Sequence, residues 1–195
     1  MSHAAVRAAL PSLPDASWDA IVPHLTSRSL TRGETLVRAG DTVDSVAFVR
    51  AGLLRMYYLR ADGREFNKSF LGPGAFCGVL DALASGAPSR LSISALAATE
   101  LTVLPWATFD ALCRRDLAWS EVGRQMAQGL AVKKMRKEAG LLLDTAEQRY
   151  ETFLAEFSEL ESVIADYQIA SYLGITPEAL SRIRRRRSKL QSPMR

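Results

Sequence analysis

The stretch "QIASYLGITPEALSRIRRRR", residues 168–187, decides how this chain is interpreted, because its pattern is that of two helices joined by a tight turn. Thr176, Pro177 and Glu178 form a helix start. A threonine hydroxyl accepts from free backbone amides, proline suits the first helical position, and a carboxylate favours the positive helix end. Gly174 supplies the positive φ of the turn. The apolar or small residues expected to pack between the two helices are Ile169, Ala170, Leu173, Ile175, Leu180 and Ile183. This spacing predicts a helix over residues 167–173 and a second helix from Pro177, in the helix-turn-helix arrangement.

The second predicted helix carries most of its basic side chains away from its apolar face. Such a face fits the major groove of DNA, since arginine makes bidentate contacts to guanine and glutamate accepts from cytosine. Further arginines would neutralise phosphates. The alternative is a solvated charged helix with a basic tail, and the helix-turn-helix pattern before it favours DNA. The candidate DNA-binding residues are Thr176, Glu178, Ser181, Arg182, Arg185, Arg186 and Lys189.

The charge distribution also indicates a polyanionic partner. The chain has 195 residues and a net charge of +4, yet residues 182–195 hold seven of its 25 basic residues and no acid. The rest of the chain therefore sums to −3. Concentrated positive charge of this kind favours a nucleic acid. No apolar run approaches the roughly 18–20 residues of a membrane span, and the N-terminus lacks the apolar block of a signal peptide. We expect a cytoplasmic protein with no membrane contact.

Few residues are available for catalysis or metal binding. Cys77 and Cys113 are the only cysteines, and His3 and His24 are the only histidines. A disulfide framework, a four-cysteine zinc or iron–sulfur site and a serine–histidine triad are therefore not expected. We predict no enzyme activity, no metal and no cofactor.

Short strands separated by turn signals are predicted between about Ser27 and Leu104. Five segments are rich in β-branched, aromatic or leucine residues: "TLVRAG", "SVAFVRAG", "LLRMYYLR", "REFNKSFL" and "LTVLPW". Asp62-Gly63 is a hairpin signal between the third and the fourth. Many short strands at this spacing indicate a sandwich or barrel-like roll. Residues 78–90, "GVLDALASGAPSR", are predicted to form a short helix followed by a loop.

Helical patterns follow Trp106. Thr108 is predicted to cap a helix over "FDALCRR". A long helix follows, on which Trp119, Val122, Met126 and Leu130 share one face. This face could pack on its own domain, but the helix is longer than one compact roll needs, so we predict that it pairs with a second copy.

A new unit is predicted to start after this long helix. Thr145 and Gln148 fit a capping box, in which the threonine hydroxyl and the glutamine side chain satisfy free backbone donors at a helix start. Residues 143–145 are therefore a predicted hinge between the long helix and a C-terminal helical unit.

Taken in order along the chain, these segments resemble the Crp/Fnr superfamily of bacterial transcription regulators. The resemblance rests on "RGETLVRAGD", "VAFVRAGLLRMYY", "DGRE", "FLGPGAFCG" and "IASYLGITPEALSRIRR" and covers about residues 26–190. It implies a cyclic-nucleotide-binding-like β-roll of the jelly-roll kind, a long dimerisation helix and a C-terminal helix-turn-helix domain. Glu178 and Arg182 match the family's base-reading pair, whereas Pro177 replaces an arginine that contacts DNA. Because only five residues follow Leu190, we expect the variant without a β-hairpin wing.

The family's cyclic AMP contacts are altered in this chain. The Gly-Glu-Leu segment, whose carboxylate holds the ribose hydroxyl, aligns with Gly78, Val79 and Leu80. The Arg-Ser/Thr-Ala segment, which holds the phosphate, aligns with Ser89, Arg90 and Leu91, so the arginine comes one place late. Lys133 and Lys134 align with the polar pair that meets the adenine. We therefore expect no cyclic AMP binding of the usual kind. The candidate effector-binding residues, for another small anion, are Gly78, Leu80, Ser89, Arg90, Lys133 and Lys134. A roll that binds no ligand is the alternative.

These inferences predict an α+β protein of three parts. Residues 1–115 form an N-terminal helix and the β-roll, residues 116–143 the dimerisation helix and hinge, and residues 144–195 the helix-turn-helix domain. The predicted function is that of a homodimeric transcription regulator that binds a sequence-specific, palindromic site in double-stranded DNA. The alternative is a sensor of a cyclic nucleotide or another small anion that signals through protein contacts instead of DNA.

Overall fold

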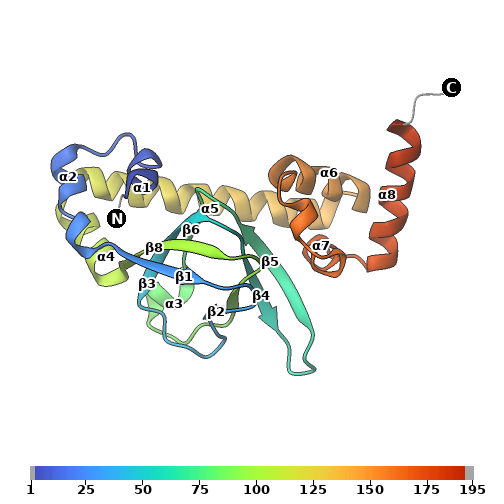
Figure 1. The fold of residues 1–195 in the computed structure, drawn as a ribbon, viewed down its shortest axis with the longest axis horizontal. Helices are drawn as coiled ribbons and strands as arrows, with labels where there is room; N and C mark the ends of the chain where they lie inside the picture. The colour runs from blue at the N-terminus through green and yellow to red at the C-terminus, as the bar shows by residue number, and fades with distance from the viewer. Residues whose placement is uncertain (1–2, 192–195) are drawn as a thin grey trace.

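Two four-stranded antiparallel sheets, a long helix and a C-terminal helical unit make up the fold (Figure 1). A computed structural model describes residues 3–191, and side chains over residues 3–188. The expectation that no wing follows the second helix concerns residues 192–195, which lie outside the described residues. No helix of residues 3–191 is long and apolar enough to cross a membrane.

The β-roll consists of two sheets whose strands are interleaved along the chain. One sheet has the order β1-β8-β3-β6 and the other β2-β7-β4-β5. The strands are β1 Thr26–Leu30, β2 Thr35–Val37, β3 Ser45–Ala51, β4 Leu54–Leu59, β5 Glu65–Leu71, β6 Phe76–Cys77, β7 Ser92–Ala95 and β8 Thr99–Pro105. The predicted α+β class and the five predicted strands are confirmed, with boundaries that differ by up to three residues. Strand β7 was not predicted, because its small side chains carry no β-branched or aromatic signal apart from Ile93.

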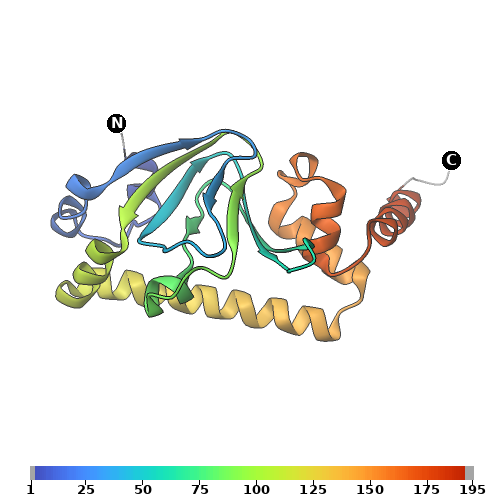
Figure 2. The same ribbon diagram turned by 90° about the horizontal axis from the view of Figure 1, so that it is seen from below.

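Short helices cover one end of the roll, and the long helix passes under it. The N-terminal helices are α1 Ala4–Ala8, α2 Asp15–Asp19 and the 3-10 helix η1 Val22–His24. Along the chain, α3 Leu80–Ser85 lies between β6 and β7, and α4 Trp106–Arg115 follows β8. Helix α5, Leu117–Leu143, runs along the whole roll (Figure 2). The C-terminal unit contains α6 Ala146–Phe157, the 3-10 helix η2 Glu161–Val163, α7 Asp166–Leu173 and α8 Pro177–Gln191.

Of the three helix caps predicted from the sequence, at Thr108, Thr145 and Thr176, only the one at Thr108 is wrong. The capping box of Thr145 and Gln148 is present at the start of α6. Asp116 caps α5, since its carboxylate accepts from the amides of Ala118 and Trp119. The predicted cap at Thr108 is wrong: α4 begins at Trp106, directly after Pro105, where β8 ends.

The prediction that Trp119 and Val122 of α5 pair with a second copy is wrong, whereas Met126 and Leu130 of the same predicted face are only partly buried. Trp119 and Val122 are buried within the chain, 1% and 5% exposed, against α1, the segment from Leu10 to Ile21 and the roll. The Trp119 indole also donates to the Ser17 carbonyl at 2.9 Å. Short N-terminal helices therefore cover the apolar stripe that the sequence left without a partner. Apart from Leu117 at its first position, the exposed large apolar side chains of α5 lie in its second half, at Val132, Met135, Leu141, Leu142 and Leu143.

One apolar core connects the roll to the C-terminal unit. Phe70 of β5 meets Phe153 and Phe157 of α6 edge to face at 6.3 and 5.9 Å between ring centroids. Its ring also lies 5.4 Å from that of Tyr172 on α7. Leu53 of the roll belongs to the same buried cluster. Because burial of large apolar side chains is the main stabilising contribution, this core holds the helix-turn-helix unit against the β4–β5 pair.

Backbone contacts reinforce that attachment. The Asn67 backbone amide donates to the Ser171 hydroxyl, and the Asn67 side-chain amide donates to the Gln168 carbonyl, each at 3.0 Å. The Lys137 ammonium donates to the Lys68 carbonyl at 2.7 Å. Strand β5 thus contacts α5 on one side and α7 on the other, so the three elements form one junction.

We predict that Gly52→Ala destabilises the fold more than Gly63→Ala. Both glycines have positive φ, +89° and +81°. A Cβ at Gly52 would lie 2.2 Å from the Ala98 carbonyl oxygen, whereas nothing lies within 4 Å at Gly63. The backbone conformation alone costs about 1–2 kcal/mol, and the clash at Gly52 adds to that loss. Urea unfolding of both variants measures the difference. Equal losses would contradict the predicted clash.

Candidate nucleic-acid interface and ligand groove

The turn between α7 and α8 has the geometry that its sequence predicts. Gly174 adopts φ +68° and ends α7. The Ile175 amide donates to the Ala170 carbonyl at 3.0 Å, and the Thr176 hydroxyl accepts from the Ala179 amide at 3.2 Å. Five of the six residues predicted to pack between the helices belong to the buried cluster that also holds Phe70, and the sixth, Ile175, is partly buried against it. The helix-turn-helix geometry is therefore set by the apolar core and by these two hydrogen bonds, one at the end of α7 and one at the start of α8.

The underside of α8 is anchored by one arginine of the basic run. Arg184 donates to the Tyr150 hydroxyl at 3.0 Å and pairs with Glu161 at 2.8 Å and with Asp166. The Tyr150 hydroxyl itself donates to Glu161. Burial, followed by this bond to Glu161, raises the pKa of Tyr150. Arg184 therefore fixes α8 against α6, η2 and α7. The sequence pattern alone placed it in an undifferentiated basic run.

The outer face of α8 exposes the predicted residues. Thr176, Glu178, Ser181, Arg182, Arg185 and Arg186 are all exposed. Lys189 lies within α8, but its side chain is outside the described residues. The pKa of Glu178 is lowered by its own backbone amide, then by Thr176, and also by the nearby Arg182. The start of α8 thus carries a hydrogen-bond acceptor, the Glu178 carboxylate, with the Arg182 cation nearby.

The arginines of α8 differ in their partners. Arg186 pairs with Glu147 at 3.2 Å and Arg187 with Glu151 at 3.4 Å, both on α6. Over residues 3–188, Arg182 and Arg185 form no ion pair with an acidic side chain. Among the described side chains of α8, these two are therefore available to an external anion without the loss of an internal ion pair.

A groove of about 1480 Å³ lies between α5 and the roll. Four of the six predicted effector residues line it: Gly78, Leu80, Lys133 and Lys134. Ser89 and Arg90 do not. The Ser89 hydroxyl, only 3% exposed, donates to the Leu91 carbonyl at 2.7 Å, so it stabilises the loop. Val79 is 1% exposed and belongs to the core of the roll, where it offers no hydrogen-bond acceptor to a ligand.

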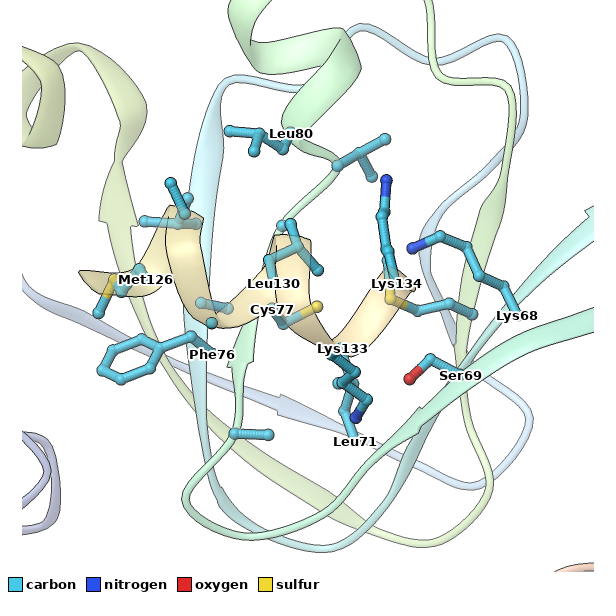
Figure 3. A pocket seen from close by; sticks show the side chains of 18 of the residues that line it. Lys68, Ser69, Leu71, Phe76, Cys77, Leu80, Met126, Leu130, Lys133 and Lys134 are labelled. Atoms are coloured by element: carbon cyan, nitrogen blue, oxygen red, sulfur yellow. The ribbon is translucent and has the colours of Figure 1, made fainter. Parts of the chain in front are cut away.

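The groove has a cationic side that sequence reasoning found only in part. Figure 3 labels Lys68 and Ser69 of β5 opposite Lys133 and Lys134 of α5. Lys137 also lines the groove, and its ammonium lies 3.6 Å from the centre of the Tyr172 ring. Burial, then the charge of Lys68, lowers the pKa of Lys137 to about 8, although Glu156 opposes this shift. The alternation within "REFNKSFL" could have placed Lys68 on one face of β5, but not opposite α5.

Comparison with known proteins agrees with this architecture. The family described as cyclic nucleotide-binding domain matches residues 27–116, from β1 through α4. The transcriptional activator protein Anr of Pseudomonas protegens is 28% identical over 171 residues, covering 80% of this chain and 68% of Anr. The fumarate and nitrate reduction regulatory protein of Escherichia coli K12 is 27% identical over 172 residues, covering 80% of this chain and 66% of that protein.

Solved structures have the same fold. FixK2 from Bradyrhizobium japonicum superposes with a TM-score of 0.76 at 24% identity, covering 85% of each chain. A structure described as a Crp/Fnr-family transcriptional regulator from Eubacterium rectale gives a TM-score of 0.71 at 19% identity, covering 90% of this chain and 83% of that one. At these identities the likeness concerns the fold, including the position of the long helix and of the C-terminal helices.

We predict that Arg184→Met destabilises the C-terminal unit, whereas Arg185→Met does not. The first substitution leaves Glu161 and the Tyr150 hydroxyl partly buried without their cation, a loss of roughly 1–3 kcal/mol. Arg185 has an exposed side chain on the same helix and serves as the matched control. Amide hydrogen exchange of α8 and urea unfolding measure the effect. Equal protection in the two variants would contradict the anchoring role of Arg184.

Proposed function

The chain is a transcription regulator of the Crp/Fnr family with a cyclic nucleotide-binding domain, and from this premise we propose that it binds a specific DNA site as a homodimer through α8. Regulators of this family bind DNA, typically as dimers. Since such relatives are regulators and not enzymes, we assign no catalytic role to the chain. The observation that carries the proposal is that Arg182 and Arg185 are exposed on α8 and form no ion pair among the described side chains, while Arg184 anchors the helix.

The geometry of α8 supports major-groove reading. Glu178 and Arg182 lie one turn apart near the start of the helix, where recognition helices contact base edges. Arg185 and Arg186 follow on the exposed side, where they fit phosphate contacts. A DNA phosphate near Arg186 would compete with Glu147, so part of the ion-pair energy within the chain offsets the energy gained from DNA.

The dimer we propose forms along the second half of α5. Val132, Met135 and Leu142 are 40%, 68% and 76% exposed and follow the spacing of a coiled-coil seam. The first half of the same face is polar, with Glu121, Arg124 and Gln128 bonded to one another. A second copy therefore gains most from covering the half next to the C-terminal units, which would bring the two α8 helices to the same side of the dimer.

We propose that each of the three predicted parts of the chain has its own role. Residues 1–115 carry the roll, residues 116–143 the dimer helix and hinge, and residues 144–195 the DNA-binding unit. We further propose that cyclic AMP is not bound in the family's usual way. Buried Val79 and the position of Arg90 outside the groove support this interpretation, because the ribose hydroxyl and the phosphate both lose a partner there.

Arg182→Ala should relax sequence preference, whereas Arg186→Ala should weaken binding to all sequences alike. A lost bidentate contact costs about 1–3 kcal/mol at its cognate base pair, and a lost phosphate contact lowers the salt dependence of affinity. Selection from a random DNA pool at one stated salt concentration measures both effects. The same selection with cyclic AMP present should give the same enrichment. An unchanged motif in Arg182→Ala would refute the proposed orientation of α8.

Met135→Glu should dissociate the dimer at micromolar concentration. It places two like charges at a symmetric seam and removes apolar area that a partner would cover. Leu59→Glu on β4 is the control, since Leu59 is 53% exposed but lies away from α5. Sedimentation velocity distinguishes the two forms. A monomeric wild type, or a Met135→Glu variant that remains dimeric, would exclude this seam.

A further inference from the structure

The middle of the groove gathers lysines with little compensating charge. Lys68 of β5 and Lys134 of α5 line it, and their side chains extend into the same part of the groove in Figure 3. Over residues 3–188, neither one pairs with a carboxylate. Lys133, also in the groove, pairs with Glu156 of α6. Asp81 of α3 raises the pKa of Lys68 without forming an ion pair with it among the described side chains.

This arrangement is unfavourable without a bound anion. Burial, then the charge of Lys134, lowers the pKa of Lys68, with a further contribution from Lys133. Lys68 in turn helps to lower the pKa of Lys137. Lys137 already contacts the Lys68 carbonyl and the Tyr172 ring, so its position is explained by the junction. Lys68 and Lys134 have no such partner. Like charges held together at a partly desolvated site favour an anionic ligand between them.

The neighbouring part of the groove is apolar. Phe76 and Leu80 are 39% and 41% exposed although they border the roll's own core. Leu130 and Met126 of α5 face them across the groove (Figure 3). Ligand pockets commonly combine an apolar lining with a few charged groups that set orientation. Here the charged groups are cations, and they gather at one end of the apolar surface.

We infer that the groove binds a small amphipathic anion, with its carboxylate, sulfonate or phosphate head at Lys68 and Lys134 and its apolar body against Phe76, Leu80 and Leu130. This deepens the proposed function, on which it rests for its regulatory meaning, by naming the chemical class of the effector. An anion with an apolar body satisfies both halves of the groove at once. A bare inorganic anion would leave Phe76 and Leu80 in water.

The site also borders the junction that holds the DNA-binding unit. Lys133 pairs with Glu156, and its ammonium lies 5.6 Å from the centre of the Phe157 ring on α6. Lys137 reaches Tyr172 of α7. A head group beside Lys68 therefore lowers the repulsion felt by Lys137 and raises its pKa. Since that pKa is about 8 without ligand, binding at pH 8 should take up protons.

A pair of dyes with nearly the same apolar body tests the inference on the full chain without DNA. Anilinonaphthalenesulfonate carries a sulfonate, and N-phenylnaphthylamine lacks it. We expect the charged dye to bind the wild type more tightly. Lys68→Met and Lys134→Met should each weaken it roughly tenfold or more while changing the neutral dye little, since each removes a charge-assisted contact. Arg124→Met, which removes a cation of α5 outside the groove, should change neither.

A further variant tests the apolar part of the groove. Phe76→Ala should weaken both dyes, because both place the same rings against that side chain. Calorimetry of the charged dye at pH 8, in buffers of different ionisation enthalpy, should report proton uptake that Lys68→Met reduces.

Four results would overturn the inference. They are equal affinity for the two dyes, no loss in Lys134→Met, displacement of the charged dye by inorganic phosphate at equal concentration, and dye binding confined to the monomeric Met135→Glu variant. The last would mean that a second copy fills the groove in the dimer. None of these results depends on DNA selection, so a failed operator search leaves the dye result intact, and the reverse also holds.

Discussion

The contact of Phe70 with the aromatic side chains of α6 and α7 is the interaction on which the arrangement of the molecule depends. Phe70 is 1% exposed and lies on β5, between the core of the roll and the C-terminal helices. Its three aromatic neighbours belong to the same cluster as Leu180 and Ile183 of α8. The position of α8 is therefore coupled to the roll through packed side chains as well as through the connection between α5 and α6. Packed interiors transmit displacement, because their side chains have few alternative arrangements.

The basic run of α8 divides into structural and available charges. Arg184 satisfies Tyr150, Glu161 and Asp166, so it serves the fold. Arg182 and Arg185 are exposed without a pair among the described side chains. Arg186 and Arg187 lie between these cases, each held by one carboxylate of α6. A run of identical residues thus acquires three roles from helical periodicity, which turns each successive side chain by about 100°.

The local rules of the sequence predicted the helix-turn-helix well and the faces of α5 poorly. Gly174, Thr176 and the capping box of Thr145 act through neighbours a few residues away, so spacing alone identifies them. The partner of Trp119 lies about a hundred residues earlier in the chain, at Ser17. No periodicity reveals that contact, and Trp119 and Val122 were consequently assigned to a dimer face although they are buried within the chain. Lys68 escaped notice for the same reason, because only the fold brings β5 opposite α5.

Helix α6 connects the two sites that this structure suggests. Its Glu156 pairs with Lys133 at the groove, and its Glu147 and Glu151 pair with the arginines of α8. The anion that we propose at Lys68 and Lys134 would change the charge acting on the Lys133–Glu156 pair, and a DNA phosphate at Arg186 would compete with Glu147. Both ligands thus act on carboxylates of one short helix, which is itself packed on Phe70. A ligand can shift a conformational equilibrium only by its differential affinity for the two states. A head group that changes the charge beside the Lys133–Glu156 pair is a source of such a difference, and that pair lies on the helix that also holds the arginines of the proposed DNA-reading face.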